Sequence, residues 1–229
     1  PYLCYNKLSL YWRVIVLLLK EVCVENFTLI PEALSRGANR VELCDNLTVG
    51  GTTVSTGVME ETIHYCGEKH VPVMAIIRPR GGNFVFHDTE LKIMKTDLME
   101  AKKLGVDGVV IGCLTADNWI DEDAITDLLD EASGLQVTFH MAFDEIPADK
   151  QFAAIDWLVE QGVERILTHG GPSHLAIEST LPRLKELVAY ADKRIIILPG
   201  GGITNENADF IAQELGVNEI HGTKIVGTL

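Results

Sequence analysis

The chain has 229 residues, of which 47% are hydrophobic and 23% charged, as in an ordinary soluble globular protein. This length is enough for one sizeable α/β domain or two small ones. The net charge is −14 and no block of basic residues occurs, which argues against binding to nucleic acid or to an anionic membrane surface. An anionic ligand would therefore need a local pocket that works against the overall charge.

The cysteines and the N-terminal segment bear on compartment and domain limits. An odd number of cysteines without a disulfide-like spacing predicts reduced thiols in a cytoplasmic protein. The apolar run at 14–19 is too short to cross a membrane, which takes about 20 residues. Residues 1–17 differ in character from the rest, and we expect them to be an extension or an added sequence without function. Residues 18–229 are expected to form a single domain. The five cysteines are Cys4, Cys23, Cys44, Cys66 and Cys113.

From residue 18 onward, short β-branched segments alternate with longer segments of helical periodicity. Four of the expected helices end at a glycine, in SRGANRVEL, KLGVDGVVI, EQGVERILT and ELGVNEIHG, and glycine there accepts the left-handed conformation that closes a helix. We expect strands at 20–24, 40–44, 72–77, 107–112, 136–141, 164–168, 194–199 and 218–222. We expect helices at 27–36, 55–66, 88–104, 121–132, 149–161, 174–191 and 205–215.

Repeated βα units imply parallel strands, and eight of them predict a TIM-type (β/α)8 barrel. The alternative is an open doubly wound sheet, but the glycine-rich turn that it would need after the first strand is absent from VCVENFTLI. The chain ends soon after the last expected strand, so the last outer helix is expected to be missing. Apolar barrel surface left uncovered there would favour a homo-oligomer.

Alternating residues give each expected strand one apolar and one polar face. In a barrel, alternate residues point into the interior, and those near the C-terminal strand ends surround the mouth. Because helices cover the outside, we expect the polar faces inside. The expected inward residues are Glu21 and Cys23; Glu42 and Cys44; Ile76, Arg78 and Arg80; Thr138, His140, Ala142 and Asp144; and Ile166 and Thr168.

Two arginines follow the third expected strand, in IIRPRGGNF, where a buried guanidinium group needs a partner. We expect Arg78 and Arg80 to face carboxylates across the barrel mouth, with His140 beside them. The carboxylates are those of Glu21, Glu42 and Asp144. The alternative is a buried ion-pair network with a purely structural role, although such networks rarely stabilise a fold more than an apolar core does.

A glycine run follows the seventh expected strand, in LPGGGIT, and another glycine ends the eighth strand. Loops at these positions of a barrel often bind phosphate through backbone N–H groups and a helix N-terminus. We therefore expect an anion site, although a tight turn is the alternative for the glycine run. Its expected residues are Arg78, Arg80, Gly200, Gly201, Gly202 and Gly222.

Seven sequence stretches resemble, in order and spacing, the CutC family of copper-homeostasis proteins over about residues 18–221. They are EVCVEN, ANRVELCDN, GGTTVSTG, IIRPRGGNF, VTFHMAFDE, ERILTHGG and LPGGGIT. The resemblance implies a cytoplasmic, often oligomeric TIM barrel that handles copper. It also implies Cys23 and Cys44 as Cu(I) ligands, and soft thiolates suit that ion. Met141 stands where the family usually has arginine, and the alternation places it facing outward.

Two functions remain open at this stage. The first is binding of Cu(I) by Cys23 and Cys44 without catalysis. The second is an enzyme acting on a small anionic or phosphorylated metabolite at the barrel mouth. In that enzyme Glu21 or Glu42 would be the general base and His140 its acid–base partner, with Asp144 at the same mouth. Arg78 and Arg80 would clamp the anion and Gly200, Gly201 and Gly202 would cradle its phosphate.

Overall fold

The computed structural model describes residues 18–229, which contain eight β-strands alternating with seven α-helices. The predicted extension at 1–17 lies outside these residues. The strands are β1 (Leu19–Glu25), β2 (Arg40–Cys44), β3 (Val73–Ile76), β4 (Gly108–Ile111), β5 (Gln136–Phe139), β6 (Arg165–Thr168), β7 (Ile196–Pro199) and β8 (Glu219–Gly222). The helices are α1 (Ile30–Ser35), α2 (Thr56–Gly67), α3 (Asp88–Leu104), α4 (Glu122–Glu131), α5 (Gln151–Glu160), α6 (Ile177–Ala191) and α7 (Ala208–Leu215).

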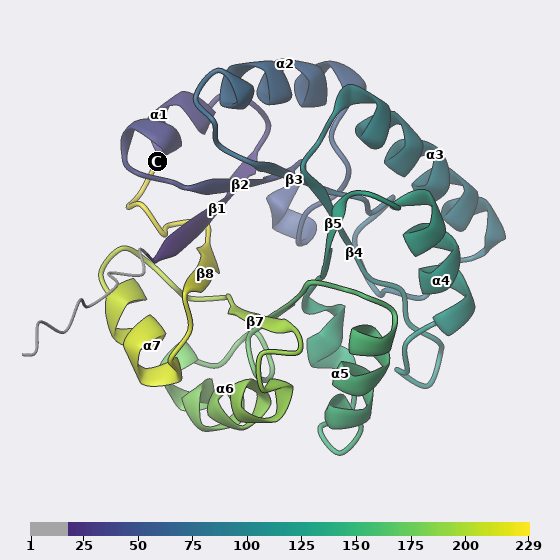
Figure 1. Ribbon diagram of the computed structural model, residues 1–229, viewed down its shortest axis with the longest axis vertical. Helices are drawn as coiled ribbons and strands as arrows, with labels where there is room; N and C mark the ends of the chain where they lie inside the picture. The colour runs from purple at the N-terminus through teal and green to yellow at the C-terminus, as the bar shows by residue number, and fades with distance from the viewer. Residues whose placement is uncertain (1–17) are drawn as a thin grey trace, which may run out of the picture.

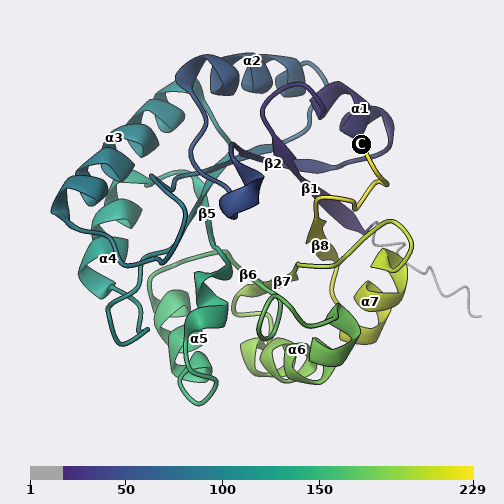
Figure 2. The same ribbon diagram turned by 180° about the vertical axis from the view of Figure 1, so that it is seen from behind.

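The strands form a parallel, nearly closed barrel surrounded by the helices (Figures 1 and 2). Each strand from β1 to β7 pairs with the next one in the chain, and β8 pairs with β1. Within residues 18–229 no hydrogen-bonded ladder joins β7 to β8, so the ring stays open at that seam. The predicted TIM-type (β/α)8 barrel is confirmed, and its helices and strands lie close to their expected positions.

The four glycines that were expected to end helices do so. Gly37, Gly105, Gly162 and Gly216 have φ angles of 95°, 92°, 76° and 67°, in the left-handed region that glycine adopts without a steric penalty. Each is followed within a few residues by the next strand. The local sequence thus fixes where each helix stops and the chain returns to the barrel.

Buried apolar residues fall into two separate groups. A large group between strands and helices contains Val22 and Leu43, whereas a small group inside the barrel contains Cys23 and Cys44. This confirms the expected alternation on β1 and β2, with apolar residues outside and the polar face inside.

On β6 the expected alternation was wrong by one residue. Arg165 and Leu167 face the interior, because Arg165 bonds to Glu219 and Leu167 lines the central cavity. Ile166 instead belongs to the outer core, and Thr168 bonds outside the cavity to Asp144. The inward polar side chain of β6 is therefore that of Arg165 and not that of Thr168.

No eighth helix follows β8 within the described part of the chain. The outward side chains Val22 and Ile220 of the β1–β8 pair are nevertheless fully buried, and so is Ile225 after β8. The apolar surface expected to be exposed at this side is therefore not found. Homo-oligomer formation stays a prediction. As for membranes, no helix of the described residues combines the length and the apolar character that a crossing requires.

Candidate functional site

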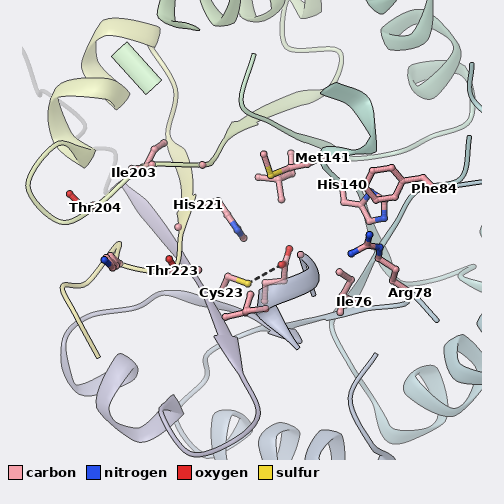
Figure 3. Close-up of a pocket in the computed structure, with 18 residues that line it drawn as sticks. Cys23, Ile76, Arg78, Phe84, His140, Met141, Ile203, Thr204, His221 and Thr223 are labelled. Atoms are coloured by element: carbon pink, nitrogen blue, oxygen red, sulfur yellow. Dashed lines mark hydrogen bonds between the residues drawn. The ribbon is translucent and has the colours of Figure 1, made fainter. Parts of the chain in front are cut away.

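A cavity of about 430 Å³ opens at the C-terminal ends of the strands (Figure 3). Much of its wall is apolar, with a few buried polar side chains pointing inward. The buried polar residues are Cys23, Glu42, Arg78, His140 and His221, the more exposed polar ones are Thr204, Thr223 and Lys224, and the apolar ones are Leu47, Ile76, Phe84, Met141, Leu167 and Ile203. A cavity of this size with few convergent polar groups is typical of a small-ligand site.

The two cysteines predicted as copper ligands lie together on the inner wall. Their Sγ atoms are 3.6 Å apart, on the adjacent parallel strands β1 and β2. Cys23 lines the cavity and donates to Glu42 Oε1 at 3.2 Å, whereas Cys44 is fully buried behind it and donates to the Val24 carbonyl at 3.3 Å. The hydrogen bond with Cys44, together with burial, raises the pKa of Cys23 well above its usual range. Cys23 is therefore a neutral thiol at physiological pH.

A third potential ligand group joins Cys23. One ligand atom each of Cys23, Glu42 and His221 lies within 4.8 Å of the other two, and all three residues are buried. Burial raises the pKa of Glu42, and its Oε2 has no hydrogen-bond partner among residues 18–229. These donors could hold a metal ion at the cavity wall.

Sequence reasoning missed His221 as a site residue. The signal that could have found it is the alternation along β8, where Glu219 and His221 share one face at the C-terminal strand end. His221 Nδ1 lies 2.8 Å from Glu21 Oε1, which leaves the Nε2 edge of the ring free to face the cavity.

Glu21 belongs to a charge network below the cavity and does not line it. It binds the Arg40 guanidinium and His221, and Arg40 in turn donates to Glu219 at 2.7 Å. Burial alone would raise the pKa of Glu21, but the His221 hydrogen bond and the Arg40 charge lower it to about 2. Burial also opposes ionisation of His221, but the Glu42 and Glu21 carboxyls raise its pKa. The expected position of Glu21 opposite Arg78 and Arg80 was therefore wrong, because Arg40 is its partner.

Arg78 reaches the cavity, as expected, but no carboxylate of residues 18–229 pairs with it. Its Nη1 donates to the carbonyls of Val49 and Gly51, each at 2.9 Å, and its Nη2 donates to the Gly82 carbonyl at 2.8 Å. The guanidinium also lies 4.8 Å from the centre of the Phe84 ring. Burial and the charge of Arg80 lower the pKa of Arg78. The expected ion pairs across the mouth are thus replaced by loop carbonyls.

Arg80 points away from the cavity, contrary to its expected position. Its Nε donates to Glu90 Oε1 at 2.5 Å, and its Nη2 donates to the Val85 carbonyl at 2.8 Å. The reason is that β3 ends at Ile76 and the chain bends at Pro79 and Arg80, so strand alternation no longer applies. No anion clamp of two arginines forms in this geometry.

His140 lines the cavity, as expected. Its Nδ1 accepts a hydrogen bond from the Ala142 N–H at 3.2 Å, while its buried Nε2 has no partner among residues 18–229. Burial and the Arg78 charge lower the pKa of His140 to about 3, so the ring is neutral at physiological pH. Gly112 makes room for it, since a Cβ there would lie 2.4 Å from His140 Cε1.

Asp144 does not reach the mouth, although it was expected there. β5 ends at Phe139 and residues Met141–Glu145 form a 3-10 helix, which breaks the two-residue alternation. The carboxylate instead accepts hydrogen bonds from the Thr168 hydroxyl at 2.5 Å and the His169 N–H at 2.9 Å. The same 3-10 helix turns Met141 into the cavity, so its expected outward position was also wrong.

Of the glycines expected to bind an anion, Gly201, Gly202 and Gly222 line the cavity and Gly200 does not. A Cβ at Gly200 would lie 2.6 Å from Leu167 Cδ1, so this glycine serves close packing. Anion binding by the other three stays a prediction. The catalytic roles predicted for Glu21, Glu42 and His140 likewise stay predictions.

Comparison with known proteins places the described barrel in one family. The family profile described as "CutC family" matches residues 18–226. The chain belongs to the CutC family. An Enterococcus faecalis protein named as a family protein CutC is 64% identical over 209 residues, covering 91% of this chain and all of the relative. The human "Copper homeostasis protein cutC homolog" is 42% identical, covering 89% of this chain and 72% of the human protein.

A solved CutC structure shares the fold. The crystal structure of a Streptococcus agalactiae protein, named for copper homeostasis and CutC, is 48% identical and superposes with a TM-score of 0.89. It covers 91% of this chain and all of the S. agalactiae chain. The resemblance seen in the sequence motifs is therefore confirmed, and CutC membership extends across the whole described barrel.

Proposed function

We propose that this chain takes part in copper homeostasis by binding Cu(I) at Cys23 and Cys44. The observation that carries the proposal is the pair of thiols, whose Sγ atoms lie 3.6 Å apart inside the barrel, with Cys23 at the cavity wall. Soft thiolate ligands select Cu(I) over the harder divalent ions. The names of the human and streptococcal relatives support the link to copper.

The two cysteines would have different roles in binding the copper ion. Cys23 faces the cavity and can receive the ion, whereas Cys44 is fully buried behind it and can complete the coordination. Glu42 and His221 stand within ligand distance of Cys23 and are candidates for a third ligand. The Nδ1–Glu21 hydrogen bond would orient the His221 ring, as carboxylates commonly do for histidine ligands.

We further propose that this activity belongs to the cytoplasm. The cysteines of the described residues, Cys23, Cys44, Cys66 and Cys113, are all free thiols. A reducing compartment keeps such thiols available to a metal, whereas an oxidising one favours disulfides.

Competition with a chromophoric Cu(I) chelator, under anaerobic and reducing conditions, tests the copper site. Cys23→Ser and Cys44→Ser should each weaken Cu(I) binding by about 100-fold or more, because loss of even a residue behind the ligands costs 10–100-fold. Cys66→Ser is the matched control, since Cys66 is also fully buried but lies in α2 in the outer core. Wild-type Cu(I) affinity in the Cys23→Ser/Cys44→Ser double variant would remove the proposal.

A further inference from the structure

Unpartnered polar atoms gather around the cavity. Among residues 18–229, six buried side-chain nitrogen or oxygen atoms have no hydrogen-bond partner, and three of them belong to residues that line the cavity. These three are Arg78 Nε, His140 Nε2 and Glu42 Oε2. A buried polar group without a partner is costly, so such a cluster indicates a missing ligand. We infer that Arg78 and His140 bind the carboxylate of a small organic acid in this cavity, beyond the proposed copper site.

Arg78 is a preorganised anion receptor. The residue is only 3% exposed, and three loop carbonyls hold its guanidinium in place. Three of its five N–H groups are used in these bonds, which leaves the Nε–H and one Nη2–H. In the proposed complex the carboxylate lies at the guanidinium edge where the Nε–H and an Nη2–H stand side by side, which is the planar fork that matches it bidentately. Carbonyls solvate the cation but do not neutralise it, so a bound anion would supply the absent counter-charge.

His140 supplies a neutral donor next to this fork. Because its Nδ1 accepts the Ala142 N–H, the ring proton must lie on Nε2, the atom without a partner. His140 and Arg78 both contact the Phe84 ring, with separations of 4.8 Å each, and Figure 3 shows the three side chains together at one side of the cavity. A carboxylate there would receive the guanidinium fork and the imidazole N–H together.

The remaining walls define the kind of acid. The buried guanidinium of Arg78 balances one carboxylate, whereas the other basic side chain of the lining, Lys224, is exposed to solvent. The apolar side chains of Leu47, Ile76 and Leu167 offer contact to a short hydrocarbon body. The volume of about 430 Å³ limits the ligand to a small molecule. Cys23 and His221 lie away from Arg78 in Figure 3, so an acid held by Arg78 and His140 leaves the thiols to the copper ion.

Isothermal titration of the reduced, copper-free protein with butyrate tests the inference without depending on copper binding. Butyrate should bind at least about tenfold more tightly than butyramide, which has the same shape but no charge. Affinity should also rise about fourfold per methylene from acetate through propionate to butyrate, as the apolar wall is covered. Equal binding of butyrate and butyramide, or binding of neither, would overturn the inference.

Substitutions in the cavity test which side chains bind butyrate. Arg78→Lys and His140→Phe should each weaken butyrate binding about tenfold or more, since lysine lacks the fork and phenylalanine lacks the donor. Arg80→Lys is the matched control, because Arg80 pairs with Glu90 and does not line the cavity, and it should bind butyrate as the wild type does. Wild-type butyrate affinity in Arg78→Lys would also overturn the inference. If Arg78→Lys fails to fold, the comparison of butyrate with butyramide in the wild type still decides.

Discussion

Replacing Glu21 with glutamine should destabilise the barrel by about 3 kcal/mol at pH 7. Glu21 is 1% exposed and is bound by both Arg40 and His221, so the variant leaves buried positive charge without its counter-ion. A pKa lowered from 4.5 to about 2 corresponds to roughly 3 kcal/mol of stability. The cost of removing one partner from a buried ion pair, about 3–5 kcal/mol, agrees with this magnitude.

Urea unfolding followed by circular dichroism measures the effect at pH 7. Glu32→Gln is the control, because the Glu32 side chain is 47% exposed in its pair with Arg36, and such surface pairs contribute about 0–1 kcal/mol. The pH dependence gives a second readout. A carboxyl with a depressed pKa stabilises the fold above its unfolded pKa of 4.5, and that stability is lost as the pH falls toward about 2.

Glu21→Gln should therefore lack this component of acid destabilisation. A change in the free energy of unfolding below about 1 kcal/mol at pH 7, with an unchanged acid profile, would refute the assignment of Glu21 as the ionised centre of the network.

Two further predictions concern the thiols and the packing of His140. Because the pKa of Cys23 is raised, Cu(I) must displace the proton of that thiol when it binds. The Cu(I) affinity measured by chelator competition should therefore rise about tenfold per pH unit between pH 6 and 8 for that thiol. An affinity that does not change with pH would contradict this. Gly112→Ala should lower the free energy of unfolding in urea by about 1–3 kcal/mol, because its Cβ would lie 2.4 Å from His140 Cε1. Gly57→Ala in α2 is the control, since a Cβ there meets open space and the variant should be as stable as the wild type or more stable. Equal unfolding free energies for the two alanine variants would show that His140 does not pack against Gly112.

The sequence was sufficient to predict the barrel because its signals are local and repeated. The glycines Gly37, Gly105, Gly162 and Gly216 mark helix ends, and the spacing of βα units leaves few other topologies. Within β1 and β2, alternation correctly placed Cys23 and Glu42 on the inner wall, whereas within β6 it was wrong by one residue.

Beyond the strand ends, the same reasoning failed for a physical reason. Arg80, Asp144 and Met141 follow the last paired residue of their strands, where a bend or a 3-10 helix replaces the two-residue period. The sequence pattern also could not predict the hydrogen-bond partners of the buried side chains. The carbonyls that hold Arg78 come from loops, and loop carbonyls have no signature in side-chain chemistry.

His221 shows a second reason why the site could not be predicted completely from the sequence. Its strand, β8, is short and was expected in the right place, but the importance of the residue arises from Glu21, which lies 200 positions earlier in the chain. Only the closure of β8 onto β1 brings the two together. Long-range pairs of this kind depend on the assembled barrel rather than on any local pattern.

The position of copper itself tests the central claim most directly. Crystals of the reduced protein loaded with Cu(I) can be measured above and below the copper absorption edge, which locates the ion by its anomalous signal. The account predicts one strong peak within bonding distance of both Cys23 Sγ and Cys44 Sγ, at the inner wall of the cavity. A peak bound elsewhere without either sulfur, or no peak at full Cu(I) loading, would contradict it.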